Sequence, residues 1–119
     1  MTSKRTNPEF MNGVPELVIL QLLARSPMHG YRLVQSIRLA TNESLSFGEG
    51  CVYPLLHRLE DEGLLKSREE IVGARTRLVY HITAKGRQQL VEKVSSWSQV
   101  VQAVHRVVYG DERGVYELG

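Results

Sequence analysis

The side chains of this sequence that could bind a metal or take part in catalysis are its single cysteine and its four histidines: Cys51, His29, His57, His81 and His105. No two of them stand at a recognised metal-ligand spacing, and no acid, base and nucleophile occur together in a known motif. We therefore expect no metal, no cofactor and no enzymatic activity. Cys51 would sit at the edge of an apolar helix stripe, which is typical of a small packing residue, although a free thiol on this helix could also sense oxidants.

Basic side chains suited to binding phosphate gather in the second half of the chain. Residues 71–91 contain no Asp or Glu and four basic side chains: Arg75, Arg77, Lys85 and Arg87. Such a local positive segment fits a DNA backbone, whereas the whole-chain net charge of +2 only permits nucleic acid as a partner. We expect Arg75 and Arg77 to contact phosphate. Two alternatives stay open, because one of them could enter a narrow minor groove and both could be solvated surface charges.

A predicted amphipathic helix contains the other main candidates for DNA contact. In the segment FGEGCVYPLLHRLEDEGLL (47–65), apolar residues recur at i, i+3, i+4 and i+7 from Val52. Acidic residues crowd its C-terminal end, so only its N-terminal half can approach phosphates. In and beside that half we place four candidate DNA-binding residues: Gly48, Tyr53, His57 and Arg58. Tyr53 could bond a phosphate and His57 and Arg58 could reach base edges, although a plain surface role for His57 stays open.

The elements that must position these residues begin with helices in the first half of the chain. The sequence predicts helices over 16–25, with Pro15 in the first turn, and over 29–41. Ser46 and Glu49 have the spacing of a capping box, which predicts the start of the third helix. The first helix is apolar almost all round, and this predicts burial against both the core and a second subunit.

A hairpin and a long helix complete the predicted fold. Alternating segments at 64–69 and 77–82, with Gly73 in the turn between them, predict two antiparallel strands. Thr83 is expected to cap a last helix that ends near residue 108. Three helices, a hairpin and a further helix give a mainly helical α+β fold, the winged helix-turn-helix, in which the third helix enters the major groove and the hairpin is the wing.

The last predicted helix has an apolar seam that needs a second chain to cover it. Its apolar residues step by 4, 3, 4, 3 and 4, as in a coiled-coil heptad: Leu90, Val94, Trp97, Val101, Val104 and Val108. A helix of this length measures about 39 Å, longer than the three-helix body beneath it. We therefore expect a homodimer with these residues at its interface and with Trp97 as an aromatic anchor.

Three separated segments resemble the PadR family of bacterial transcriptional regulators: SPMHGYRLVQSI, FGEGCVYPLLHRLEDEGLL and RLVYHITAKGRQQL, which together cover about residues 13–97. The resemblance implies a homodimeric repressor of the short type, whose small-molecule effector, in some members a flat aromatic compound, binds between the long helix and the DNA-binding body. Trp97 then has a second candidate role as an effector contact. Tyr31, in the HGYR run, resembles a family position that packs against the third helix, with phosphate contact as the alternative.

The sequence thus predicts an N-terminal arm (1–12), a winged helix-turn-helix domain (13–82), a dimerisation helix (83–109) and a tail (110–119). The predicted function is specific binding of double-stranded DNA at a palindromic operator with half-sites about 34–36 Å apart. The alternative is a winged-helix module that binds a protein partner and no DNA. Because the chain has no apolar run of about 18 residues and no secretory h-region at its start, we expect a cytoplasmic, nucleoid-associated protein.

Overall fold

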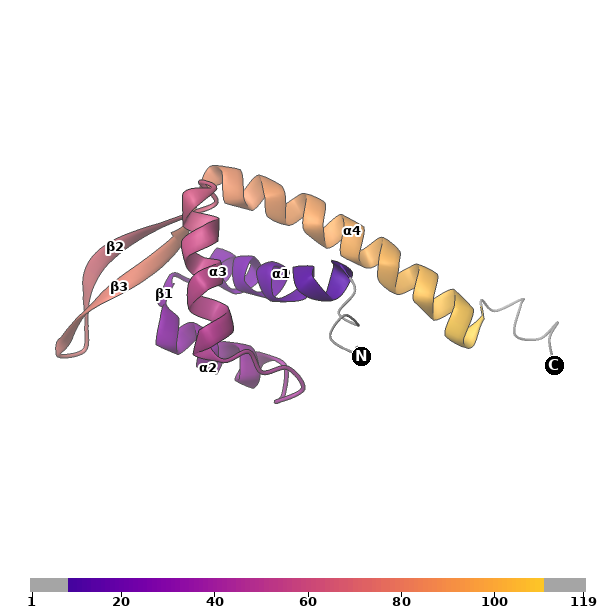
Figure 1. The fold of residues 1–119 in the computed structure, drawn as a ribbon, viewed down its shortest axis with the longest axis horizontal. Coiled ribbons are helices and arrows are strands. Elements are labelled where there is room, and N and C mark those ends of the chain that lie inside the picture. The colour runs from indigo at the N-terminus through magenta and orange to yellow at the C-terminus, as the bar shows by residue number, and fades with distance from the viewer. Residues whose placement is uncertain (1–8, 111–119) are drawn as a thin grey trace.

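The computed structural model describes residues 9–110 as helices joined to a small antiparallel sheet (Figure 1). In chain order the elements are α1 (Glu9–Arg25), β1 (Met28–His29), α2 (Gly30–Ala40), α3 (Glu49–Asp61), β2 (Leu65–Val72), β3 (Arg75–Ile82) and α4 (Ala84–Tyr109). We call α1, α2 and α3 the body and the β2–β3 hairpin the wing. The wing and α4 extend to opposite sides (Figure 1). The predicted α+β winged helix with a long C-terminal helix is confirmed.

One apolar core lies between the body, the base of the wing and the start of α4. Its largest fully buried side chains are Tyr80, Ile19, Leu20, Leu23, Leu33, Ile37, Leu56, Leu59, Leu65 and Val52. Burying a side chain of this kind stabilises the fold by roughly 1.5–3 kcal/mol. Leu90 of α4 also belongs to this core and is only 8% exposed. The prediction that Leu90 lies at a dimer interface is therefore corrected, because the first turns of α4 pack on the body of the same protomer.

The first helix begins earlier than the sequence predicted. α1 starts at Glu9, and Pro15, expected in its first turn, lies inside it. A proline inside a helix removes one backbone hydrogen bond, but Val14 and Glu16 on either side of it are buried and hold the helix in place. Residues 9–12 of the predicted arm are therefore helical, whereas its first eight residues and the predicted tail beyond Gly110 lie outside the described residues.

The predicted hairpin is longer than expected and is joined by a third strand. β2 pairs antiparallel with β3 over the full length of both strands, and Gly73 adopts φ 66° in the turn. β1 adds to the other edge of β3, with Met28 opposite Tyr80 and His29 opposite Val79. A strand of two residues is too short to show an alternating pattern, so it was not predicted. It fixes the start of α2 beside the wing.

Backbone turns define both ends of α3. The N-cap is Gly48 and no side chain caps the helix, so the predicted capping box of Ser46 and Glu49 is wrong. Glu49 is already the first helical residue, which leaves Ser46 outside the cap position. At the other end Gly63 adopts φ 80°, and its N–H and that of the next residue bond to carbonyls of the last turn, the Schellman ending of a helix. The chain therefore passes from α3 directly into the wing.

The start of α4 is attached directly to the wing. As predicted, Thr83 caps the helix, because its hydroxyl oxygen accepts a hydrogen bond from the Gly86 N–H at 3.0 Å. The same hydroxyl donates to the Gly63 carbonyl at 2.7 Å. Gly86 lies so close to the Leu64 carbonyl that a Cβ atom at this position would overlap it. Only glycine permits this approach, which fixes α4 against the end of α3 and the base of the wing.

Candidate nucleic-acid interface

A cleft between α3, the start of α2 and the wing brings together four of the predicted DNA contacts. It measures about 240 Å³ and is lined by His29, Gly30, Tyr53, His57, Arg75, Thr76, Arg77, Leu78 and Tyr80. Tyr53 and His57 come from α3, and Arg75 and Arg77 come from β3. Residues that are distant in the sequence therefore share one surface, which we call the wing cleft.

A second hollow extends this surface between α2 and the tip of the wing. It measures about 510 Å³ and is lined by His29, Tyr31, Arg32, Gln35, Ser36, Leu39, Val72, Gly73 and Arg77. His29 and Arg77 line both hollows. This tip groove adds Tyr31 to the interface and also Arg32, which the sequence did not single out. Arg32 lies in the first turn of α2, and only β1 and the wing bring that turn beside Arg77.

A glycine in α2 positions the ring of Tyr53. A Cβ atom at Gly30 would lie 2.6 Å from Tyr53 Cζ and 2.7 Å from the Tyr53 hydroxyl oxygen, so no larger residue fits there without moving the ring. Tyr31, expected to pack against the third helix, is instead 47% exposed. Gly30 contacts the third helix through Tyr53, and the exposed side of Tyr31 lines the tip groove, where its alternative role as a phosphate contact would place it.

His29 lies between the two hollows and caps α2. Its Nδ1 accepts a hydrogen bond from the Arg32 N–H at 3.3 Å, which requires the neutral imidazole. Partial burial lowers the pKa of His29 below its usual value, and the charges of Arg77 and Arg32 lower it further. The part of this shift that is due to the two arginines indicates that positive charge lies close to the junction of the two hollows, where a phosphate would be stabilised.

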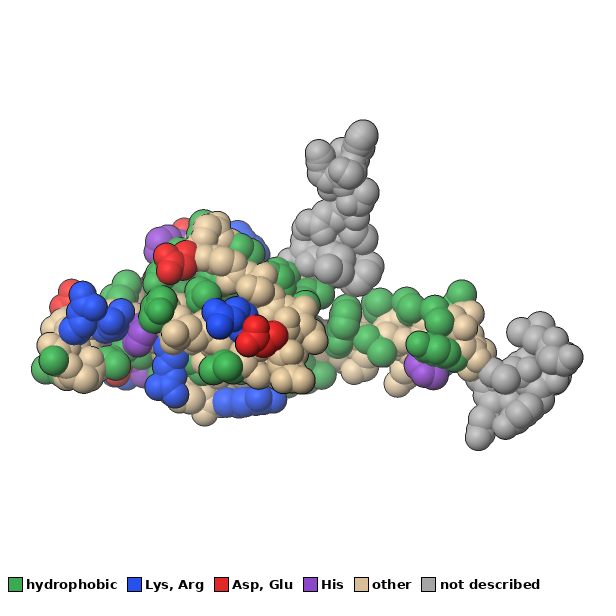
Figure 2. Space-filling view, turned by 90° about the horizontal axis from the view of Figure 1, so that it is seen from below, with side chains coloured by type: hydrophobic (Ala, Val, Ile, Leu, Met, Phe, Trp, Pro, Cys, Tyr) green, Lys and Arg blue, Asp and Glu red, His purple; other side chains and the backbone are tan. Residues whose placement is uncertain are grey.

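The arginines of this surface have no acidic partner among the residues that the structure describes. Arg32, Arg75 and Arg77 form no ion pair within residues 9–110, and Figure 2 shows Lys and Arg side chains exposed over the wing. The other basic residues of the positive segment, Lys85 and Arg87, instead donate to backbone carbonyls of the protomer. Unpaired guanidinium groups suit phosphate oxygens, which accept charge-assisted hydrogen bonds.

Arg58, predicted to read base edges, does not line the wing cleft. Its guanidinium donates to Glu16 of α1 at 2.9 Å and to Glu62 at 2.9 Å. Both contacts occupy the group with carboxylates of its own protomer. Gly48 also lies outside the cleft, at the exposed N-cap of α3. The structure thus separates Arg58 from Tyr53 and His57, although all three lie on one helix.

The acidic end of α3 has partners within the fold. Glu60 accepts hydrogen bonds from the Ser67 N–H at 3.2 Å and from the Ser67 hydroxyl at 2.7 Å. Glu62 accepts its bond from Arg58. The acids that we expected only to keep phosphate away from this end of the helix also attach α3 to β2 and stabilise its last turn.

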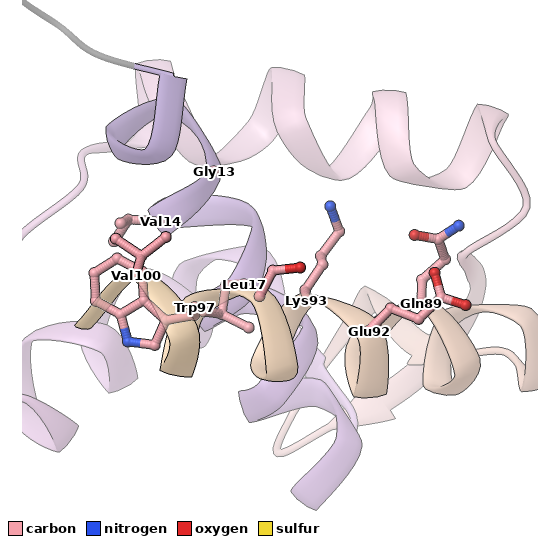
Figure 3. Close-up of a pocket in the computed structure, with 9 residues that line it drawn as sticks. Gly13, Val14, Leu17, Gln89, Glu92, Lys93, Trp97 and Val100 are labelled. Atoms are coloured by element: carbon pink, nitrogen blue, oxygen red, sulfur yellow. The ribbon is translucent and has the colours of Figure 1, made fainter. Parts of the chain in front are cut away.

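A separate cavity lies between α1 and α4 (Figure 3). It measures about 310 Å³ and is lined by Gly13, Val14, Leu17, Gln89, Glu92, Lys93, Ser96, Trp97 and Val100. Trp97 lies at one end of this lining and Gln89 and Glu92 at the other, with Lys93 between them (Figure 3). The lining therefore combines a half-buried indole with one acidic and one basic side chain, Glu92 and Lys93, and Lys93 is ion-paired with Glu16 at 2.8 Å. We call it the α1–α4 cavity.

The outer half of α4 exposes apolar side chains. Val101, Val104 and Val108 are 43%, 52% and 61% exposed, and Figure 2 shows hydrophobic side chains along the projecting part of the helix. With Val94 and Trp97 they make up what we call the α4 seam. Contiguous exposed apolar surface of this kind marks an interaction site.

The described residues show no cluster of three or more His, Cys, Asp or Glu side chains that could hold a metal ion. Cys51 is exposed on α3, rather than packed at the edge of the core. His81 is hydrogen-bonded to Glu70 at 2.6 Å on the wing, and the rings of His105 and Tyr109 lie 4.8 Å apart. None of the helices within residues 9–110 is long and apolar enough to cross a membrane.

Comparison with known proteins identifies relatives along most of the chain. Residues 19–92 match the model of the transcriptional regulator PadR-like family. The chain is 34% identical over 96 residues to transcriptional regulator Rv3488 of Mycobacterium tuberculosis, covering 81% of this chain and 87% of that protein. A crystal structure of a PadR-like transcriptional regulator from Bacillus cereus is 30% identical, with a TM-score of 0.75 over 87% of this chain and 100% of that chain. A transcriptional regulator from Clostridium thermocellum is 25% identical, with a TM-score of 0.75 over 89% of this chain and 96% of that chain.

Proposed function

Since the chain belongs to the PadR-like family of transcriptional regulators, we propose that it is a sequence-specific DNA-binding repressor that acts as a homodimer. The observation that supports this proposal is the wing cleft, where Tyr53 and His57 of α3 lie beside Arg75 and Arg77 of the wing. A helix that can reach bases and a strand that can hold phosphate then lie on one surface, as winged-helix binding to DNA requires.

In the proposed complex the N-terminal half of α3 enters the major groove. His57 reads base edges, and Tyr53 donates its hydroxyl to a phosphate. Arg75 and Arg77 hold the DNA backbone from the wing, because their guanidinium groups have no carboxylate partner within the described residues.

The start of α2 and the start of α3 supply further phosphate contacts in this proposal. Tyr31 and Arg32 line the tip groove next to the wing. Gly48 lies at the exposed N-terminus of α3, where helix N–H groups favour an anion. We do not assign a base contact to Arg58, since both of its partners are carboxylates of the protomer.

The α4 seam supplies the proposed dimer contact. Exposed valines along one helix are covered most simply by the same seam of a second copy, in a two-fold arrangement. A two-fold dimer matches a palindromic operator whose half-sites lie about 34–36 Å apart. Repression follows where this operator overlaps a promoter, which places the protein at the nucleoid.

The α1–α4 cavity is the proposed effector site. The indole of Trp97 with Val14 and Val100 suits a flat aromatic ring, and a negative substituent on it would compete with Glu16 for Lys93. Trp97 lies both in this cavity and on the α4 seam, so its roles as dimer anchor and as ligand contact are compatible. An effector bound here would alter the packing of α4 on α1 and thus the separation of the two recognition helices.

Selection from a pool of DNA duplexes with a randomised central segment tests the DNA-binding proposal. The selected duplex and a scrambled version are then compared by fluorescence anisotropy at about 50 mM and 200 mM salt, because phosphate contacts weaken steeply over this range. We expect a palindromic selected sequence, tighter binding to it than to the scrambled duplex, and a strong salt dependence.

Failure to enrich any sequence, together with no binding at the lower salt concentration, would contradict the proposal. The alternative of a winged-helix module for a protein partner would then replace it. The variant Arg106→Ala is the control for any variant that removes an arginine from the wing cleft. Arg106 lies on the last turn of α4, on the side of the heptad opposite the seam. This variant should bind DNA like the unmodified protein.

A further inference from the structure

A buried carboxylate connects three helices of the protomer. Glu16 of α1 is 8% exposed. Its Oε1 accepts a hydrogen bond from Arg58 of α3 at 2.9 Å, and its Oε2 lies 2.8 Å from Lys93 Nζ of α4. One side chain of α1 therefore bonds both to the helix proposed to read DNA and to the helix proposed to form the dimer. We call Arg58, Glu16 and Lys93 the triad.

The triad keeps Glu16 charged despite its burial. Burial by itself raises the pKa of this carboxyl, but the hydrogen bonds and charges of Lys93 and Arg58 outweigh it and hold the pKa below its usual value. A buried charge that loses a partner is costly, so Glu16 depends on both cations. If either cation moves away from Glu16, the other cation or a water molecule has to replace its hydrogen bond to the carboxylate.

One end of the triad, Lys93, lines a proposed site, whereas the other end, Arg58, lies outside the wing cleft but on the helix that lines it. Lys93 lines the α1–α4 cavity, one helical turn before Trp97. Arg58 follows His57 directly in α3, and His57 lines the wing cleft. Glu16 is the shared partner between them, and the two cations bond to different oxygens of its carboxylate. A displacement of α4 that draws Lys93 away changes the environment of the carboxylate that holds Arg58.

We propose that Glu16 is a positioning residue that couples the α1–α4 cavity to the orientation of α3, through Lys93 on one side and Arg58 on the other. This inference rests on the proposed DNA-binding function and adds to it a residue outside both sites. When Lys93 stays on Glu16, Arg58 is held and α3 keeps the orientation that fits DNA. When Lys93 is drawn to another anion, the hold on α3 weakens. Because coupling between two binding sites is reciprocal, DNA on α3 must also change the surroundings of Trp97.

A purely structural role of the triad makes a different prediction. If Glu16 only holds the helices together, its loss lowers the stability of the fold and leaves the communication between α3 and Trp97 intact. The chain contains one tryptophan, so tryptophan fluorescence reports on the surroundings of Trp97 alone, where the α1–α4 cavity meets the α4 seam. Trp97 emission measured with and without the selected duplex therefore separates the two roles.

The test compares Glu16→Gln and Lys93→Met with two controls on the full chain. Glu92→Gln makes the same chemical change as Glu16→Gln in the lining of the same cavity. Glu62→Gln removes the other carboxylate partner of Arg58 and leaves Glu16 in place. Lys93→Arg keeps the positive charge on Glu16 and should behave as the unmodified protein. Thermal unfolding of each variant shows whether it is folded.

We expect the duplex to shift the Trp97 emission of the unmodified protein, both controls and Lys93→Arg. In Glu16→Gln and Lys93→Met the duplex should still bind, with affinity lower by roughly five- to 150-fold, the usual range of coupling between sites, but without the emission shift. Lys93→Met should weaken binding in the unmodified background and have no further effect in the Glu16→Gln background, since the two changes break one connection.

Three results would overturn the coupling. One is an unmodified protein that binds the duplex with no change in Trp97 emission, which leaves the DNA-binding proposal standing. Another is a folded Glu16→Gln or Lys93→Met variant that keeps the full shift. Strictly additive losses of affinity in the double variant are the third. If Glu16→Gln fails to fold, Lys93→Met decides alone, because it leaves Glu16 paired with Arg58. A protein that binds no duplex at all removes the proposed function and the coupling with it.

Discussion

The wing and the outer half of α4 both project from the body, but the wing presents unpaired positive charge whereas α4 presents unpaired apolar surface. Arg75 and Arg77 have no ion-pair partner within the described residues, and Val101 and Val108 have little cover. Each projection lacks what a different partner supplies, a polyanion for the wing and a second apolar helix for α4. In the proposed function, two partners of different chemistry therefore cover the two projections.

The largest expected effect comes from placing a charge in the α4 seam. Val101→Glu would bury a carboxylate from each subunit in the proposed dimer, at several kcal/mol per ion, and should weaken association by at least about a thousandfold. Sedimentation or light scattering at micromolar concentration should then report a monomer. Gln102→Glu introduces the same charge one residue away from the seam and should stay dimeric. A dimeric Val101→Glu variant would mean that α4 is covered in another way.

The next effect concerns the wing. Replacing both Arg75 and Arg77 with Ala should weaken binding to the selected duplex by about a hundredfold, at about 1.5 kcal/mol for each hydrogen bond to a charged group. The slope of log affinity against log salt should also fall by about 2, because each phosphate contact contributes about 1. Anisotropy titrations over a salt series measure both quantities. An unchanged slope would show that these arginines are solvated charges, and it would remove the contrast between the wing and α4.

A smaller effect is expected at the glycine under Tyr53. Gly30→Ala forces the ring of Tyr53 out of its place, which should lower the free energy of unfolding by about 1–3 kcal/mol and also weaken DNA binding. Gly13→Ala is the control, because a Cβ atom there meets nothing within 4 Å, and it should stabilise α1 by about 0.5–1 kcal/mol. Denaturant unfolding checks both values. In the background of Tyr53→Ala, the loss of unfolding free energy caused by Gly30→Ala should largely disappear. If the losses of the two single variants add up in the double variant, the contact between Gly30 and Tyr53 is contradicted.

The smallest expected effect is the pH dependence due to His29. Its pKa in the folded protein lies below the usual value of 6.5, so between these two pKa values the unfolded chain binds more protons than the folded one. The stabilising contribution is fully present above about pH 6.5 and is lost as the pH falls through the folded pKa. Thermal unfolding of the unmodified protein should show this loss of stability when the pH is lowered from about 7.5, which is one unit above the usual His pKa. His29→Asn keeps a capping side chain without titrating, and an identical profile for it would contradict the assignment.

Periodicity in the sequence predicted the elements of the fold, because local patterns determine them. Val52 and Leu56 repeat at helix spacing in α3, and both are fully buried as expected. β1 could not be predicted, since it has two residues and exists only because β3 offers it a free edge. The capping box failed because Ser46 has the right spacing to Glu49, but the backbone turns into the helix only at Gly48.

The candidate site was less predictable than the fold, since side-chain partners depend on contacts between distant segments. Arg58 and Arg77 look alike in the sequence as exposed basic residues near a DNA-binding surface. The structure separates them, because Arg58 meets Glu16, 42 residues earlier in the chain, whereas Arg77 meets no carboxylate within the described residues. The sequence placed Glu16 in an apolar helix and showed no partner for it.

The junction between the wing and α4 has a mechanical consequence. A single residue, Thr83, separates β3 from α4, and Gly86 fits directly against the Leu64 carbonyl. From this pivot α4 extends over 26 residues, so it acts as a lever about 39 Å long. A rotation of about 5° at the pivot would displace its far end by about 3 Å, close to the rise of one DNA base pair. In the proposed dimer, the fit of one glycine against one carbonyl oxygen therefore contributes to the spacing of the operator half-sites, together with the contacts of Leu90 and Lys93 on the body.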